Sequence, residues 1–290
     1  MNKSCLIGFL MCSAFSLVVQ AATDGAHITK TISQIERKKG IKRTIQYRPD
    51  GNDFVCVNGK NRYTRALYGG ITDFRIETSD RPVFAAYKPK DSKHICFRLQ
   101  CGNQSIALDS LKFCEARYRA GRRTYRLTDP LLGKGELNIS VLAFPDAEGG
   151  IWRFTMKDMP EGALLHCYIS EIRAKNLSRN GDMGADRADS FDAPQLPKEQ
   201  KHYKLSLDGT TAYIVVEDQE LRLPALVEGT SLYDKSEKWR SEIESSLQIS
   251  TPDPYFNPLG GALAAAADGI WDGKIWLHGA IGWRSQLNGW

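Results

Sequence analysis

Short β-forming runs divided by turn residues dominate the chain from about Arg43 to Pro224, and this pattern constrains the fold most strongly. The runs alternate polar and apolar side chains or are rich in β-branched and aromatic residues, and Gly, Asn, Asp and Pro separate them. The predicted strands are residues 53–57, 71–79, 83–87, 94–101, 114–120, 122–127, 136–144, 151–156, 164–171 and 211–217. So many strands without intervening helices favour an antiparallel β-sandwich over a parallel α/β sheet.

Glycine dipeptides predict where these strands turn. Asn58-Gly59 predicts a type I′ hairpin, because both central residues of that turn need a positive φ. Ala120-Gly121 and Asp208-Gly209 predict two further turns. A domain of this size commonly keeps one core, so residues 22–230 are assigned to a single β-sandwich domain.

Residues 1–21 have the pattern of a secretory signal peptide. Lys3 precedes an apolar run from Cys5 to Val19, and the small residues Ala21 and Ala22 follow. A retained membrane anchor is the alternative, but the run is short for a spanning helix, which needs about 20 apolar residues. We therefore expect cleavage near Ala21, a periplasmic, cell-surface or secreted protein, and no transmembrane anchor after cleavage.

Charge and cysteine content exclude several kinds of partner and site. The chain has 39 Lys and Arg against 34 Asp and Glu, spread along its length, whereas a nucleic-acid binder concentrates its basic residues on one face. No spacing matches a zinc ribbon, and we predict neither a cofactor nor a metal. An odd number of cysteines remains after cleavage, and we expect most to be small buried side chains. These are Cys56, Cys96, Cys101, Cys114 and Cys167.

The sequence changes character after Pro224. Trp239, Ile243 and Leu247 recur at four-residue spacing and predict an amphipathic helix, and three prolines follow at 252, 254 and 258. Residues 231–258 are therefore assigned to a linker helix and a Pro-rich linker. The small-residue run that follows has high helix propensity, so residues 259–290 are interpreted as the truncated start of a helical domain.

Four of the six tryptophans lie in the last 23 residues, from Asp268 to Trp290. A sugar site needs aromatic platforms for the apolar faces of the ring and polar groups for its hydroxyls. The predicted substrate-binding residues are Asp268, Trp271, Trp276, His278, Trp283 and Arg284. The alternative is that the tryptophans form the core of the helical domain and that His278 is structural.

Two other segments are polar enough to form a site, although no short catalytic motif is present and the catalytic residues are not predicted. Residues 180–192 hold acids that suit Ca²⁺, but their spacing departs from the EF-hand pattern, and a solvated loop explains them as well. Residues 61–70 and 79–82 combine Arg and Tyr with glycines that a β-bulge or tight turn would equally require.

Five stretches resemble an exported bacterial family, domain of unknown function 4450. They are residues 61–70, 79–82, 128–133, 179–186 and 252–290. That family is similar to six-hairpin glycosidases, in which a supersandwich-like N-terminal β-sandwich precedes an (α/α)6 toroid and leans over its sugar-binding cleft. The resemblance implies that this chain holds the sandwich and the start of the toroid, with the catalytic residues beyond Trp290.

We therefore expect the N-terminal part of a secreted glycoside hydrolase that acts on a polysaccharide or oligosaccharide and is inactive as this fragment. The alternatives are a non-catalytic carbohydrate-binding module, a polysaccharide lyase, and a structural envelope protein without a sugar ligand. Architecture alone does not choose among them, because one fold serves many functions.

Overall fold

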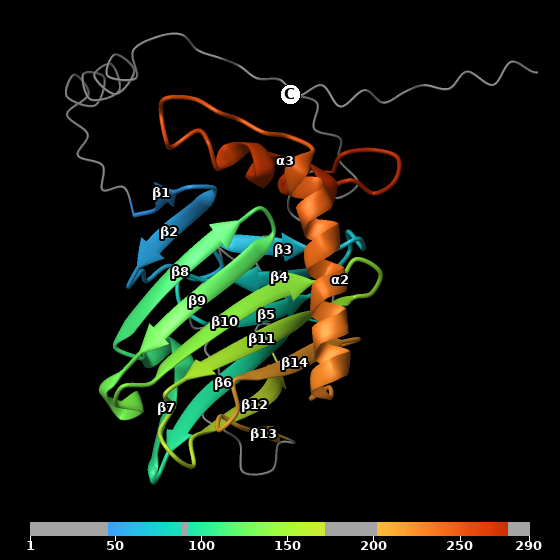
Figure 1. Ribbon diagram of the computed structural model, residues 1–290. Helices are drawn as coiled ribbons and strands as arrows, with labels where there is room; N and C mark the ends of the chain where they lie inside the picture. The colour runs from blue at the N-terminus through green and yellow to red at the C-terminus, as the bar shows by residue number, and fades with distance from the viewer. Residues whose placement is uncertain (1–45, 89–91, 172–201, 278–290) are drawn as a thin grey trace, which may run out of the picture.

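The computed structural model describes residues 46–88, 92–171 and 202–277, which form two antiparallel β-sheets packed face to face and two helices (Figure 1). Sheet A has eight strands, in the order β1 (Arg48–Asp50), β2 (Asp53–Val57), β8 (Phe113–Arg119), β9 (Arg122–Thr128), β10 (Glu136–Ala143), β11 (Gly149–Lys157), β14 (Thr211–Glu217) and β15 (Glu220–Arg222). Sheet B has the order β13 (His202–Ser206), β12 (Leu164–Glu171), β6 (Lys93–Cys101), β5 (Phe84–Tyr87), β4 (Arg75–Thr78) and β3 (Arg65–Tyr68), and β7 (Gln104–Ala107) pairs with β6. The short 3₁₀ helices are η1 (Leu108–Ser110) and η2 (Pro130–Leu132), and the α-helices are α2 (Leu226–Ser245) and α3 (Leu259–Gly269).

The predicted antiparallel, sandwich-like β fold is confirmed. Strands β2, β12 and β14 have the predicted bounds, and the other predicted strands differ only at their ends. The strands that the sequence pattern missed are β1, β3, β7, β13 and β15. Each is short, and four of them lie at sheet edges, where burial is incomplete and the apolar alternation is weak.

The main core fills the space between the two sheets. In β8 and β9, buried and half-buried residues alternate strictly, because successive side chains point to opposite faces of a sheet. Aromatic rings from both sheets meet edge to face, with Phe84 lying 5.7 Å from both Phe97 and Trp152 between ring centroids. Each such pair adds about 0.5–1.5 kcal/mol beyond the area that it buries.

The three predicted turns had different outcomes. Ala120 and Gly121, both with positive φ, form the β8–β9 hairpin turn as predicted. The hairpin predicted at Asn58-Gly59 is wrong, because β2 pairs with β1 and β8 and not with the next strand. A Cβ at Gly59 would lie 2.5 Å from Oδ2 of Asp80, so close packing against the β4–β5 connection requires this glycine. Asp208-Gly209 lies in a bend that joins β13 of sheet B to β14 of sheet A.

Helix α2 packs on the outer face of sheet A, against β10, β11 and β14 (Figure 1). Its buried residues are Gly229, Tyr233, Ser236 and Arg240, which follow helical spacing but are mostly polar or small. Gly229 permits the close approach, because a Cβ there would lie 2.4 Å from the ring of Tyr213 on β14. The helix therefore begins earlier than the apolar repeat of Trp239, Ile243 and Leu247 predicts, and that repeat lies on another face.

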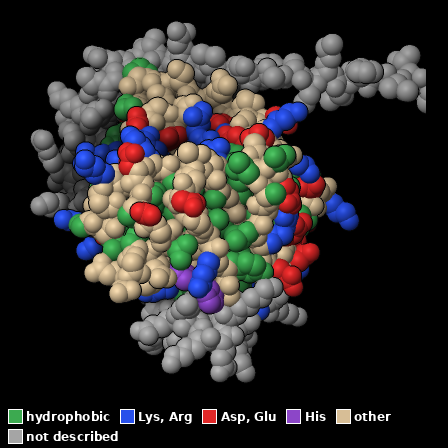
Figure 2. All heavy atoms as spheres, turned by 60° about the horizontal axis from the view of Figure 1, so that its bottom comes forward, with side chains coloured by type: hydrophobic (Ala, Val, Ile, Leu, Met, Phe, Trp, Pro, Cys, Tyr) green, Lys and Arg blue, Asp and Glu red, His purple; other side chains and the backbone are tan. Residues whose placement is uncertain are grey.

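Ion pairs tie the second half of α2 to the β8–β9 hairpin. Arg119 Nε donates to Glu244 at 2.7 Å, and Arg122 Nη1 donates to Glu237 at 2.7 Å. Arg240, which is almost fully buried, bonds both of these glutamates and the carbonyl of Ala120. Elsewhere, basic and acidic side chains are interspersed on the face that Figure 2 shows, and histidine side chains gather at one place on it. The neighbouring rings of His166 on β12 and His202 on β13 lie 5.6 Å apart.

Candidate functional site

A groove of about 740 Å³ lies between α2, α3 and the turn that follows α3. We call it the tryptophan groove. Trp239 and Ile243 of α2 line it, since residues four apart share one helix face, and so does Leu247 just after the helix. The remaining lining residues are Glu242, Ser246, Leu263, Ala264, Ala267, Asp268, Trp271 and Trp276. The groove is therefore mainly apolar and carries two carboxylates.

The turn after α3 presents two tryptophans at the groove. Trp271 and Trp276 form an antiparallel bridge, and their ring centroids lie 4.5 Å apart at an interplanar angle of 45°. Asp272 closes the turn, because its Oδ1 accepts hydrogen bonds from the amides of Lys274 and Ile275 at 2.9 and 2.8 Å. Trp271 is 37% exposed and Trp276 is 57% exposed, whereas the smaller Leu277 is buried. The two largest apolar side chains of the turn thus face solvent and the groove.

Contacts with the β-sandwich hold this turn in place. Thr72 Oγ1, in the β3–β4 connection, donates to the carbonyl of Trp271 at 2.7 Å. Within the turn itself, the amide of Leu277 donates to the carbonyl of Ile270 at 2.9 Å. Gly269 lies directly on the ring of Tyr68, where a Cβ would be 2.4 Å from the nearest ring carbon. The sandwich, and not the turn alone, positions the tryptophan pair.

Asp268 lies at the junction of the groove and a second cavity. That cavity, of about 230 Å³, extends toward the sandwich and is lined by Arg65, Tyr118 and Arg240, among others. Asp268 remains exposed to solvent, yet partial desolvation raises the pKa of its carboxyl. A carboxyl group at such a junction can accept or donate hydrogen bonds to a bound polar ligand.

The structure brings together half of the predicted substrate-binding residues. Asp268, Trp271 and Trp276 line one groove. His278, Trp283 and Arg284 lie outside the described residues, as do residues 180–192. Trp239 and Glu242 were not predicted as site residues. The four-residue repeat of Trp239, Ile243 and Leu247 was the one sequence pattern that could have placed Trp239 there.

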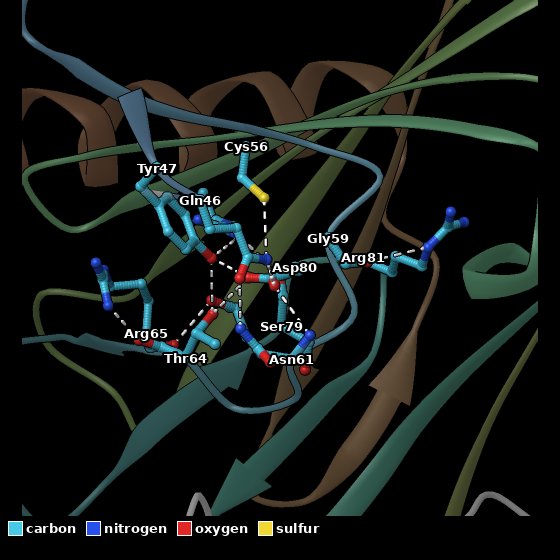
Figure 3. A network of polar contacts seen from close by, with 12 residues as sticks. Gln46, Tyr47, Cys56, Gly59, Asn61, Thr64, Arg65, Ser79, Asp80 and Arg81 are labelled. Atoms are coloured by element: carbon cyan, nitrogen blue, oxygen red, sulfur yellow. Dashed lines mark hydrogen bonds and ion pairs between the residues drawn. The ribbon is translucent and has the colours of Figure 1, made fainter. Parts of the chain in front are cut away.

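The segments 61–70 and 79–82 form a closed network around Asp80 (Figure 3). Asp80 is fully buried, and Figure 3 shows Gln46, Tyr47, Asn61 and Thr64 gathered around it. The groups that contact its carboxylate are Gln46 Nε2 at 2.5 Å, Tyr47 OH, the Asn61 amide at 2.9 Å, Thr64 Oγ1 at 3.3 Å and Arg123 Nη2 at 3.8 Å. Because Arg123 belongs to sheet A and Asp80 to a loop of sheet B, this network joins the two sheets.

Close backbone packing explains the glycines of the same segment. A Cβ at Gly69 would lie 1.9 Å from the carbonyl oxygen of Phe144, and one at Gly70 would lie 1.9 Å from that of Pro145. Gly70 also donates its amide to Phe144 at 3.2 Å. These glycines allow sheet B to approach the β10–β11 connection closely.

The five cysteines of the described residues are unpaired, and all but Cys101 are buried. Burial raises the pKa of Cys96 and of Cys114 to about 12, so both are thiols at neutral pH. In the part of the chain that the structure describes, no three His, Cys, Asp or Glu side chains gather as a metal site would require. No helix within that part has the length and apolarity needed to span a membrane.

Comparison with known proteins finds similarity to one family over part of the chain. No curated protein matches the chain. Residues 89–217, which include β6 to β14, match the family model described as a domain of unknown function (DUF4450). This match covers the central strands of both sheets but less than half of the chain, and it shows a similarity to that family of unknown function.

Proposed function

We propose that this chain is the N-terminal part of an exported glycoside hydrolase and that its tryptophan groove binds a sugar unit of the substrate. The pair Trp271 and Trp276 carries the proposal, because two large rings stay exposed at a groove while Leu277 is buried. Exposed aromatic faces beside carboxylates suit the apolar faces and hydroxyl rim of a sugar.

Asp268 and Glu242 are the proposed hydrogen-bonding partners at this groove. Both line it, and the desolvation that raises the pKa of Asp268 strengthens hydrogen bonds made there. A hydrolase also needs two carboxyl groups placed across the glycosidic bond. We propose that an (α/α)6 toroid beginning at α3 supplies both groups, and that the sandwich positions the substrate.

A binding experiment tests the proposal on this chain. Isothermal titration calorimetry with a panel of neutral oligosaccharides should detect binding to at least one, and Trp276→Ala should weaken it by about tenfold or more, since stacking of one ring contributes about 1–3 kcal/mol by analogy with base stacking. Tyr255→Ala is the matched control, because Tyr255 is similarly exposed but lies outside the groove. Equal loss in both variants, or no binding to any oligosaccharide, contradicts the proposal.

Activity measurements separate the rival functions. The hydrolase predicts new reducing ends from a polysaccharide incubated with the full-length gene product, and Asp268→Asn should reduce their release. An ultraviolet-absorbing unsaturated uronate would instead identify a lyase. Binding without cleavage of any polysaccharide would identify a carbohydrate-binding module.

A further inference from the structure

The outer face of sheet A carries a second, polar depression of about 260 Å³. We call it the polar trough. Two rows of register partners on β9, β10 and β11 line it, namely Thr124, Ser140 and Arg153 in one row and Arg126, Asn138 and Thr155 in the other. The four short side chains of these rows form its floor. Neighbouring strands lie about 4.8 Å apart, so the polar groups within a row are separated by about the width of a sugar ring. The longer side chains of Arg126, on β9, and Arg153, on β11, lie on opposite sides of this floor.

Arg153 differs from the other arginines of the trough. Its Cζ lies 3.9 Å from the ring centroid of Tyr233 on α2, and no carboxylate among the described residues forms an ion pair with it. Its Nε is buried and has no hydrogen-bond acceptor in the described part of the chain. A buried, charged N–H group without an acceptor is costly, and the planar guanidinium can donate two parallel hydrogen bonds to a carboxylate or sulfate.

The other charges of the trough are balanced. Arg117 and Arg126 both pair with Glu115, at 2.9 and 3.3 Å, and Arg126 also pairs with Glu136 at 3.4 Å. A polyphosphate backbone would need several available cations. One available guanidinium beside neutral polar groups suits a ligand with a single acidic group per unit.

Neutral donors complete the trough. The hydroxyls of Thr124 and Thr155 make no hydrogen bond to another described residue, and both line the depression. We propose that the polar trough binds an acidic saccharide, with the carboxylate or sulfate of one unit on Arg153 and neighbouring hydroxyls on Thr124 and Thr155. This site lies on the sandwich, apart from the tryptophan groove, and does not depend on the function proposed for that groove.

Matched oligosaccharides test this assignment. Calorimetry of the purified chain should show binding of β-1,4-mannuronate hexasaccharide or of chemically sulfated mannohexaose, and far weaker binding of neutral mannohexaose of the same linkage and length. The two acidic arms distinguish a carboxylate from a sulfate ligand. Inorganic sulfate is the third arm: if it binds as tightly as the saccharides, the trough is a simple anion site and the proposal fails.

Variants locate the site. Arg153→Gln should weaken binding of the acidic saccharide by about tenfold or more, and Thr155→Val, which keeps the side-chain shape, by about twofold to fivefold. Arg48→Gln removes one exposed positive charge from β1, outside the trough, and should change affinity less than about twofold. Trp276→Ala should leave this affinity unchanged.

Two outcomes would overturn the proposal. Equal losses in Arg153→Gln and Arg48→Gln would show only general charge attraction and would overturn the proposal, as would the absence of binding by either acidic saccharide. Thermal unfolding of each variant establishes folding. If Arg153→Gln does not fold, an unchanged affinity in Thr155→Val overturns the proposal by itself.

Discussion

Trp271 and Trp276 meet across one tight turn with ring centroids 4.5 Å apart, while Thr72 of the sandwich holds the carbonyl of Trp271 at 2.7 Å. The sandwich therefore fixes the orientation of an aromatic pair that lies nearly 200 residues further along the chain. A rigid platform of this kind loses little conformational entropy when a ligand binds, which is what a recognition site requires.

Tyr233 is predicted to be the main anchor of α2 on sheet A. It is buried with Leu142, Phe144, Ile151 and Val215, and its hydroxyl lies 2.6 Å from that of Ser140. Tyr233→Ala should lower the free energy of unfolding by about 3–5 kcal/mol through cavity formation, and Tyr233→Phe by about 1 kcal/mol through loss of the hydrogen bond. Urea unfolding measures both, and equal effects of the two variants would contradict this role.

The buried pair of Asp80 and Arg123 is predicted to be essential for stability. Asp80→Ala leaves a buried guanidinium without its counter-charge and should cost about 3–5 kcal/mol in the free energy of unfolding. Asp208→Ala, at an exposed aspartate in the β13–β14 connection, is the control and should cost less than about 0.5 kcal/mol. Chemical denaturation tests the pair, and a small loss in Asp80→Ala would show that the network is dispensable.

Glu244 makes the attachment of α2 sensitive to acid. Desolvation raises the pKa of Glu244, but hydrogen bonds from Arg119 and Arg240 outweigh it, so the pKa in the folded state is below the usual 4.5. The stabilisation is therefore present above about pH 4.5 and is lost as pH falls through the lower folded-state pKa. Thermal unfolding between pH 6 and pH 3 should show a shallower decline in Glu244→Gln than in the parent protein. Parallel profiles would refute this linkage.

The sandwich was predictable where strands are central. In β12 and β14 an apolar run flanked by turn residues predicted both ends of the strand, because a strand that is paired on both sides and buried is apolar along its length. The Asn58-Gly59 signal failed because a tertiary contact, the packing of Gly59 against Asp80, overrode a local turn preference. Local patterns cannot report contacts between residues that only the fold brings together.

The candidate site was only partly predictable for a related reason. The composition of one segment pointed to Asp268, Trp271 and Trp276, but Trp239 and Glu242 reach the groove from a separate helix. The buried face of α2 is polar, with Ser236 and Arg240 upon it, so hydrophobic periodicity marks the groove face of that helix and not the face on sheet A.

The most direct test of sugar binding follows the indole N–H signals of ¹⁵N-labelled protein during titration with the oligosaccharide that binds best in calorimetry. We expect saturable shifts for Trp271, Trp276 and Trp239, while the signal of Trp152, fully buried between the sheets, stays in place. Saturable binding that leaves the signals of Trp271 and Trp276 unmoved would show that the sugar does not bind at the tryptophan groove.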